Sequence, residues 1–252
     1  MLSALDDRRL WTLLARRPLF VGLDYDGTLA PIVTRPEDAH LPGATRAALA
    51  RLAARAPVAL VSGRDLSDLR HFVDLPGLLY AGSHGFDMAL PPGAPEPPQP
   101  GVAYLPALDE AEAALRRHLA AVPGTHVERK RFAIAAHYRE AGESAAPAVQ
   151  WAIEAARRPG LRVSDAKMVL ELRPAVDWHK GAAFRWLHRT FRPKARTLFI
   201  GDDATDEDAF LALPRGGVGV LVATEERPTA ARWRLDDTDA VRRFLERLAA
   251  LD

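Results

Sequence analysis

The sequence predicts an α/β fold, in which a doubly wound parallel sheet is interrupted by a smaller inserted α+β unit. Short apolar runs alternate with segments whose apolar residues recur at helical spacing, and this alternation is typical of βαβ units. A proline-rich stretch at 91–100, in which six of ten residues are proline, breaks the alternation because it cannot continue a helix or a central strand. The alternation resumes at Lys180, so we expect the residues between to form an insertion.

The N-terminal part of the parallel sheet is predicted from three apolar runs. In chain order we expect a strand at 19–23, a helix at 44–56, a strand at 58–61, a helix at 66–73 and a strand at 78–81. The first run is apolar throughout, as expected for a strand that is covered on both faces of its sheet.

The insertion has a different order of elements. We expect, in order, a helix at 108–119, strands at 125–131 and 132–139, a helix at 148–157, and strands at 161–165 and 168–173. This order is typical of an open-faced α+β unit with an antiparallel sheet. After the insertion we expect a helix from Lys180, strands at 197–200 and 218–222, and an amphipathic helix at 239–248.

The length of the chain allows two domains. With 252 residues, 48% of them apolar, the chain can form one large domain or two modest ones. We place the parallel-sheet domain at 1–101 and 175–252 and the inserted domain at 102–174, with hinges near Gly101 and 174–177.

Charge and cysteine content exclude several classes of protein. The 34 basic and 33 acidic residues give a net charge of +1, which offers no whole-chain attraction for nucleic acid or an anionic membrane. The chain has no cysteine, so disulfides, thiolate metal sites and cysteine nucleophiles are excluded. No segment has about 18 consecutive apolar residues, and the N-terminus lacks the apolar core of a signal peptide. We therefore expect a cytoplasmic monomer that binds neither nucleic acid nor membrane.

Polar side chains follow the predicted parallel strands or open a helix at four places. They are Asp24 and Asp26, Ser62, Lys180, and Asp202, Asp203 and Asp206. Because the carboxyl ends of parallel strands share one edge of a sheet, we expect these groups to converge. Two bare carboxylates about 4 Å apart repel by roughly 4 kcal/mol at an effective dielectric of 20. Such a group needs a cation, and its hard oxygen ligands suit Mg²⁺ holding a phosphate.

Each of these groups also has an ordinary explanation when it is taken alone. The Asp-x-Asp-Gly sequence at Asp24 and the Gly-Asp-Asp sequence at Asp202 both occur in turns. Ser62 can cap a helix, and Lys180 can be a solvated surface charge. The occurrence of all four groups in one chain favours the phosphate site. Nucleotide binding has little support, because the chain lacks a Gly-Lys-Ser/Thr loop and a third glycine after Gly217-x-Gly219.

In their order and context, the four groups resemble the motifs of the haloacid dehalogenase (HAD) superfamily of phosphatases. The resemblance implies a HAD-like hydrolase core in which Asp24 is the nucleophile and forms an aspartyl-phosphate. It implies that Asp26 is the acid/base, which protonates the leaving oxygen and later activates water. Ser62 would bind the transferring phosphoryl group, and Lys180 would neutralise its charge.

The same resemblance implies a Mg²⁺ cofactor. Its ligands would be Asp24, the backbone carbonyl of Asp26, and Asp202. Asp203 or Asp206 would bind the ion directly or support these ligands.

A finer resemblance covers nearly the whole chain and points to the trehalose-6-phosphate phosphatases. The stretches that carry it are Asp24–Leu29, Ser62–Arg64, His84–Gly85, Val127–Lys130, His137–Arg139, Glu171–Pro174 and Gly201–Glu207. It implies that the chain removes phosphate from trehalose 6-phosphate. In this family the insertion is a mobile cap that selects the substrate.

Candidate contacts to the sugar phosphate are Arg64, His84, Glu128, Lys130, Arg139, Lys167 and Glu171. A disaccharide presents only hydroxyls, so its recognition needs paired donors and acceptors, because each unpaired buried polar group costs about 1 to 3 kcal/mol. The alternative is that the residues of the insertion form cross-strand ion pairs on an exposed sheet face. Arg64 could equally be an ion-pair partner at a helix start.

Two positions depart from the family pattern. Asp87 stands where a glutamate is frequent, which leaves its contact in doubt. Arg129 stands where an acidic residue is common, and we expect it at a solvated position.

Two other functions remain open. One is phosphatase activity on another sugar phosphate, such as sucrose 6-phosphate or mannosyl-3-phosphoglycerate. The other is a sugar-phosphate sensing module without turnover. The second predicts the loss of a catalytic carboxylate or of Lys180, yet Asp24, Asp26, Lys180 and Asp202 are all present.

Overall fold

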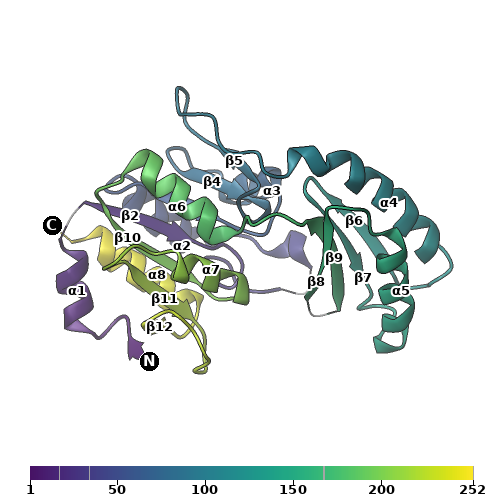
Figure 1. Ribbon diagram of the computed structural model, residues 1–252. Coiled ribbons are helices and arrows are strands. Elements are labelled where there is room, and N and C mark those ends of the chain that lie inside the picture. The colour runs from purple at the N-terminus through teal and green to yellow at the C-terminus, as the bar shows by residue number, and fades with distance from the viewer. Residues whose placement is uncertain (17, 34, 167, 252) are drawn as a thin grey trace. The chain divides into compact units, whose positions relative to one another are not determined.

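The protein folds as two compact units. The computed structural model describes residues 1–16, 18–33, 35–166 and 168–251 (Figure 1). The core unit consists of Met1–Pro97 and Trp178–Asp252, and the insertion consists of Pro98–Asp177. Among the described residues, no helix combines the length and the apolar character needed to cross a membrane.

The core unit is built on an eight-stranded sheet with the order β1-β12-β11-β10-β2-β3-β4-β5. All neighbouring strands are parallel except β4 and β5. The strands are β1 (Leu2–Ser3), β2 (Leu19–Leu23), β3 (Val58–Val61), β4 (Leu79–Gly82), β5 (Asp87–Ala89), β10 (Arg196–Gly201), β11 (Val218–Val222) and β12 (Trp233–Leu235). Leu23 of β2 lies opposite Ile200 of β10 and Leu60 of β3, so these central strands end side by side.

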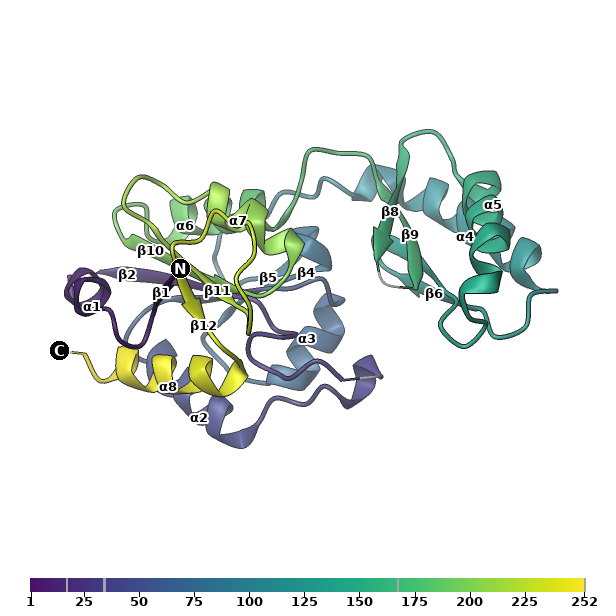
Figure 2. The same cartoon turned by 90° about the horizontal axis from the view of Figure 1, so that it is seen from below.

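Helices cover both faces of this sheet. They are α1 (Arg8–Leu14), α2 (Gly43–Ala53), α3 (Leu66–Val73), α6 (Lys180–Phe191), α7 (Glu207–Leu211) and α8 (Thr238–Ala249). One apolar layer contains residues of α1, α2, α3 and α8, and the opposite layer contains residues of α6 and α7. Figure 2 shows α2 and α8 on one side of the sheet and α6 and α7 on the other. This arrangement confirms the predicted doubly wound fold.

The sequence of β2 fits its position between the two layers. Leu19, Val21 and Leu23 belong to the layer of α1, α2, α3 and α8, whereas Phe20 belongs to the layer of α6 and α7. Gly22 leaves room on the second side, because a Cβ atom there would lie 2.4 Å from the ring of Phe199. The alternation along one short strand therefore supplies both apolar layers.

The insertion has four antiparallel strands and two helices, as the sequence predicts. The sheet order is β6-β7-β9-β8, with strands β6 (His126–Lys130), β7 (Ala133–His137), β8 (Leu161–Ala166) and β9 (Val169–Pro174). Helices α4 (Leu105–Leu119) and α5 (Ala146–Ala156) pack on one side of the sheet, and their apolar residues form a core with those of the strands (Figure 2). In the described part of the insertion, neither helix covers the other side of the sheet, which we call the open face.

Several short elements were not predicted from the sequence. They are β1, β5, β12, α1 and α7, and the 3₁₀ helices Pro36–Asp38, Ser83–Gly85, Val102–Tyr104, Glu143–Ala145 and Ala204–Asp206. The unpredicted strands have only two or three residues, and the register with a neighbour rather than their own pattern defines them.

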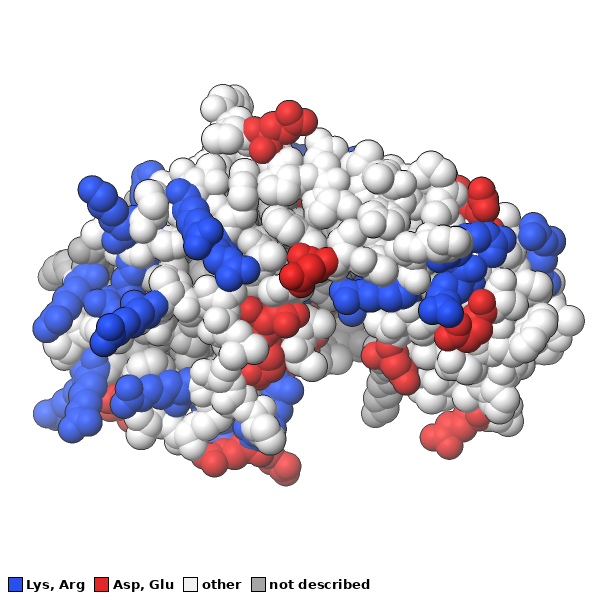
Figure 3. All heavy atoms as spheres, viewed as in Figure 1, with Lys and Arg blue, Asp and Glu red and all other residues white. Residues whose placement is uncertain are grey.

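The basic side chains are unevenly distributed over the surface of the core unit. Figure 3 shows Lys and Arg side chains gathered over the side of this unit that carries α1 and α6. In sequence, 181–201 contains no acidic residue, and Arg185, Arg189, Arg192 and Lys194 lie in this segment. Acidic residues of the core unit include the group at the sheet edge where β2 and β10 end.

Candidate active site

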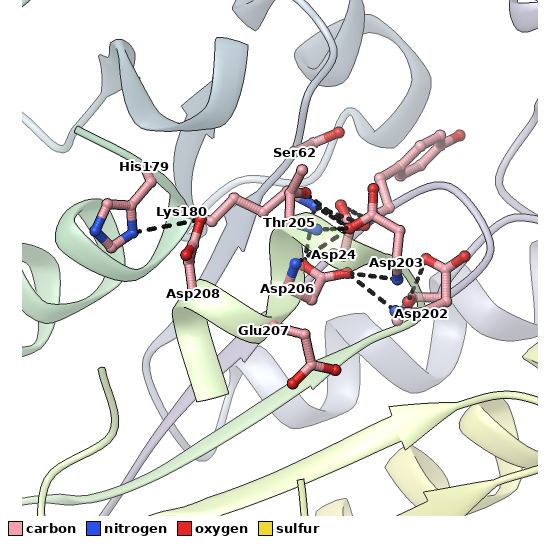
Figure 4. A network of polar contacts seen from close by, with 12 residues as sticks. Asp24, Ser62, His179, Lys180, Asp202, Asp203, Thr205, Asp206, Glu207 and Asp208 are labelled. Carbon is pink, nitrogen blue, oxygen red and sulfur yellow. Dashed lines mark hydrogen bonds and ion pairs between the residues drawn. The ribbon is translucent and has the colours of Figure 1, made fainter. Parts of the chain in front are cut away.

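Apart from Asp26, whose carboxylate pairs with Arg64, the polar groups predicted to converge lie together at the carboxyl ends of β2, β3 and β10. Asp24 follows β2, Ser62 follows β3, and Asp202, Asp203 and Asp206 follow β10. Lys180 is the first residue of α6 and points towards Asp24 and Asp206 (Figure 4). The sheet order explains this convergence, because β10, β2 and β3 are neighbours.

Lys180 is a buried cation that holds the acidic residues together. Only 2% of its side chain is exposed. Its Nζ lies 2.9 Å from Asp24 Oδ2, 2.9 Å from Asp206 Oδ1 and 3.7 Å from Asp203 Oδ1. A buried ammonium group requires such partners, since its desolvation is otherwise too costly. The alternative that Lys180 is a solvated surface charge is therefore wrong.

The loop after β10 is stabilised by backbone hydrogen bonds to its own carboxylates. Asp203 Oδ1 accepts from Thr205 N at 2.8 Å and from Asp206 N at 3.1 Å. Asp206 Oδ2 accepts from Asp202 N at 3.0 Å and from Asp203 N at 3.1 Å. Gly201 is needed at the start of this loop, because a Cβ atom there would lie 2.3 Å from the Asp206 carboxyl carbon. These bonds fix the carboxylates before any ligand arrives.

The carboxylates carry more negative charge than Lys180 offsets. Burial, together with the negative charge of Asp206, raises the pKa of Asp24 well above its ordinary value. Burial, with repulsion from Asp206 and Asp203, likewise raises the pKa of Asp202 to about 7. Burial opposes ionisation of Asp203 too, but Lys180 and the hydrogen bond from Thr205 lower the pKa of Asp203 to about 2. The site therefore favours an additional cation.

Three of these carboxylates fit a divalent metal. Asp24, Asp203 and Asp206 each offer an oxygen, and the three oxygens lie within 4.8 Å of one another. Carboxylate oxygens are the hard ligands that Mg²⁺ prefers. The carboxylate of Asp202 faces Thr28 instead, with Thr28 Oγ1 3.5 Å from Asp202 Oδ1. Its role as a metal ligand stays a prediction.

Asp26 and Arg64 form a bidentate ion pair. Arg64 Nε and Nη2 donate to the two Asp26 oxygens at 2.7 and 2.6 Å. The guanidinium lies over the rings of Tyr25 and Phe72, at 5.2 and 4.8 Å from their centroids. The carboxylate of Asp26 is thus held apart from the carboxylates around Lys180. Contacts of Arg64 with a substrate stay a prediction.

Ser62 and His84 lie at the ends of β3 and β4. Ser62 is buried, and its Oγ accepts a hydrogen bond from Arg64 N at 3.2 Å. It does not cap α3, because the residue before that helix is Asp65. Ser83 and His84 have positive φ angles of 48° and 56°, and the turn they form brings the His84 ring against Gly63. A Cβ atom on Gly63 would lie 2.8 Å from His84 Cε1, so this close approach requires glycine.

The predicted sugar contacts of the insertion lie on or near its open face. Lys130 Nζ lies 3.2 Å from Glu171 Oε1, and Glu128 Oε2 lies 2.7 Å from His137 Nε2. Arg139 is exposed two residues after β7. Lys167 lies outside the described residues.

The two departures from the family pattern occupy different environments. Asp87 is the first residue of β5 and lies opposite Gly82 of β4. Arg129 was expected at a solvated position, but its side chain is only 19% exposed. It forms ion pairs with Asp109 at 2.8 Å and Glu112 at 3.4 Å, and so links β6 to α4. The expectation of a solvated position for Arg129 is wrong, because its side chain pairs with acidic residues of α4 that lie far from it in the sequence.

Two contacts of the site carry no signal in the sequence. Arg227 Nη2 donates to the backbone oxygen of Asp202 at 2.8 Å from a loop 25 residues further along the chain. Phe72 supports Arg64, although its helical spacing indicates only a core position. The link between Glu128 and His137 could have been found, since two polar residues on adjacent strands of a hairpin are diagonal neighbours.

Comparison with known proteins gives consistent matches along the chain. The sequence model of the family described as trehalose-phosphatase matches residues 22–239. A trehalose-phosphate phosphatase of Mycobacterium marinum is 43% identical over 238 residues, which are 91% of this chain and 61% of the relative. The chain therefore spans about three fifths of that relative's length.

Solved structures agree with these sequence matches. A trehalose-6-phosphate phosphatase of Aspergillus fumigatus has a TM-score of 0.69 at 29% identity, with full coverage of both chains. The C-terminal domain of a Candida albicans trehalose-6-phosphate phosphatase has a TM-score of 0.80 at 22% identity, also with full coverage, and shows the likeness of fold.

Proposed function

Because the chain belongs to the trehalose-phosphatase family, we propose that it hydrolyses trehalose 6-phosphate to trehalose and inorganic phosphate. The observation that carries the proposal is the buried cluster in which Lys180 joins Asp24 and Asp206 at the ends of β2 and β10. A sensing module that only binds would not need a buried nucleophilic carboxylate. The cluster therefore favours turnover.

In the first step an Asp24 carboxylate oxygen attacks phosphorus. The bond between phosphorus and the sugar oxygen breaks, and Asp26 gives its proton to that oxygen, so that trehalose leaves. Asp24 is suited to this role because it is fixed at the end of a buried strand, with Oδ1 accepting from Tyr25 N at 2.7 Å and Oδ2 paired with Lys180. The product of the step is an aspartyl-phosphate.

In the second step water replaces Asp24 on phosphorus. Asp26 accepts a proton from the water, and the attack releases inorganic phosphate and restores the Asp24 carboxylate. The bidentate pair with Arg64 fixes the position of the Asp26 carboxylate for this step. For the first step Asp26 must be protonated, so Arg64 has to release it and is then free to bind an anionic group of the substrate.

Lys180 and Ser62 assist the transfer without forming bonds to phosphorus. Lys180 brings a fixed positive charge close to the attacked group, and a preorganised charge of this kind is effective because it need not reorient during the reaction. The hydroxyl of Ser62 can donate a hydrogen bond to a phosphoryl oxygen, while its oxygen accepts from Arg64 N. Both side chains are buried, which protects these interactions from water.

We propose Mg²⁺ as the cofactor, because the oxygen donors of Asp24, Asp203 and Asp206 fit it. The backbone carbonyl of Asp26 and the carboxylate of Asp202 are further proposed ligands. When bound, the ion supplies positive charge that offsets both the acidic cluster and the phosphoryl oxygens.

The insertion is proposed to select the sugar. Its open face presents both donors and acceptors, among them Glu128, Lys130 and Glu171, as a polyhydroxyl ligand requires. In the structure these side chains pair with one another or with a histidine, as the alternative of cross-strand ion pairs expects. Sugar recognition and cross-strand pairing are compatible if hydroxyl groups of a bound sugar replace part of these side-chain pairs.

The test is phosphate release from trehalose 6-phosphate, compared with sucrose 6-phosphate, glucose 6-phosphate and mannosyl-3-phosphoglycerate. Each substrate is measured with Mg²⁺ and with a chelator. We expect strong preference for trehalose 6-phosphate and loss of turnover with the chelator. Preference for another substrate would contradict the sugar assignment, and binding without turnover of any of the four would favour the sensing module.

A further inference from the structure

The open face of the insertion has a floor of small residues. Ala133 and Ala135 of β7 point to this face, while their neighbour Ile134 belongs to the apolar core below. Because the alanines are short, side chains from β6 and β9 reach across β7. Lys130 of β6 and Glu171 of β9 meet in this way, with 3.2 Å between Nζ and Oε1. Polar side chains thus lie over the two alanines, which are buried.

Glu128 is held on this face by a histidine. It lies opposite Ala135 on β7, and His137 comes two residues further along β7 on the same face. The Nε2 atom of His137 lies 2.7 Å from Glu128 Oε2. The hydrogen bond from His137, against the opposing effect of burial, lowers the pKa of Glu128. The carboxylate therefore stays an ionised acceptor.

Both groups are accessible to a ligand. The Glu128 side chain is 41% exposed and that of His137 is 31% exposed. The pair uses one carboxylate oxygen, and the other oxygen, Oε1, accepts no hydrogen bond from a side chain of the described chain. A carboxylate with one oxygen fixed and one available suits the binding of a sugar hydroxyl.

We propose that His137 is a positioning residue for sugar recognition, which fixes the Glu128 carboxylate on the open face so that its second oxygen accepts a sugar hydroxyl. The inference rests on the proposed function, since it takes the ligand to be a sugar phosphate. A free glutamate rotates about three side-chain bonds, and binding must immobilise them. The His137 ring holds the Glu128 carboxylate before the sugar binds, so less side-chain entropy is lost on binding. Removal of His137 should therefore weaken the affinity for the substrate.

A matched control is available on the same sheet face. His126 of β6 lies opposite His137, with 6.0 Å between the ring centroids. It is exposed, and no side-chain hydrogen bond to it is found in the described ranges. Replacing His126 therefore changes the same residue type in the same place without releasing Glu128.

The experiment measures kcat and KM for trehalose 6-phosphate in the wild type and in each variant, with p-nitrophenyl phosphate as a substrate that lacks the sugar. We expect His137→Ala to raise KM for trehalose 6-phosphate about tenfold with little change in kcat. His137→Gln, which keeps an N–H donor, should recover part of the loss. His126→Ala should stay within about twofold of the wild type. In a Glu128→Ala background, His137→Ala should add less than about twofold, because the two residues act as a unit.

Three results would overturn the inference. One is an equal KM for the His137→Ala and His126→Ala variants. Another is an equal loss with p-nitrophenyl phosphate, which would indicate a general structural defect. The third is an undiminished effect of His137→Ala in the Glu128→Ala background. If the wild type turns over a different sugar phosphate of the panel, the proposed function fails separately, and the same comparison is made with that substrate.

Discussion

At the level of single residues, burial and partners decide what each polar group does. Lys180 and Asp206 are both buried, and each is tolerated because the other is 2.9 Å away. Asp24 joins the same pair, so its carboxylate is fixed in place and its pKa is raised, mainly by burial. Asp26 lies only two residues further but is half-exposed and faces Arg64 instead. Neighbouring carboxylates are thereby given different environments, as a nucleophile and an acid/base require.

Tyr25, between these two aspartates, gives a prediction about pH. Its ring is buried, and its hydroxyl donates to Ala39 O at 2.6 Å. Burial raises the pKa of Tyr25 to about 12, whereas an unfolded tyrosine ionises near 10. The folded state therefore gains stability from the neutral phenol that is fully present below pH 10 and is lost as the pH rises towards 12.

The measurement is urea unfolding of the wild type and of Tyr25→Phe between pH 8 and pH 11.5. At pH 8 the variant should be less stable by about 1 to 2 kcal/mol, because the Ala39 carbonyl loses its donor. Above pH 10 the difference should shrink, by at most about 1.4 kcal/mol per pH unit. A difference that stays constant over this range would contradict the assignment.

At the level of elements, close packing of β2 against α6 places Lys180 beside Asp24. Gly22 of β2 allows this approach, because a Cβ atom there would lie 2.5 Å from a ring atom of Phe184 on α6. At the start of α6, a Cβ atom on Gly181 would lie 2.0 Å from the backbone oxygen of Asp208, so glycine also lets α6 approach the chain that carries Asp206. Gly22 and Gly181 thus allow the close packing that brings Lys180 within reach of its carboxylate partners.

We expect Gly22→Ala to destabilise the protein by about 1 to 3 kcal/mol, because the buried rings of Phe184 and Phe199 must move. The midpoint of urea unfolding measures the change. Gly43→Ala is the control, since Gly43 begins α2 and a Cβ atom there meets nothing within 4 Å. Equal midpoints for the two variants would show that the core tolerates the added methyl group and would refute this account of the packing.

At the level of the whole molecule, the features that arise from local pattern were predictable from the sequence. The apolar run at 19–23, the polar residues directly after it and the order of elements in the insertion all appear in the structure. The convergence of Asp24, Ser62 and Asp202 was predictable because parallel strands share an edge. These features depend on neighbours in the chain or on a general rule of sheet topology.

The remaining features depend on contacts between distant segments. The pairing of Asp26 with Arg64, the support of Asp202 by Arg227 and the link of Arg129 to α4 each join residues whose own spacing shows nothing unusual. Strand β12 has three residues and is defined by its register with β11 and β1. Such contacts can be identified only from the folded structure. The sequence pattern predicts which face of a helix or strand is buried, but not which distant segment packs against it.

The central claim is that Asp24 is the nucleophile of a phosphatase, and the most direct test is phosphate release from trehalose 6-phosphate by Asp24→Asn with Mg²⁺ present. Asp24→Ala serves as the control for deamidation of the introduced amide, and thermal unfolding checks the fold. We expect turnover to fall by at least about 10³-fold in both variants, with the unfolding midpoint little changed. Substantial residual turnover in the folded Asp24→Ala variant would contradict the covalent mechanism.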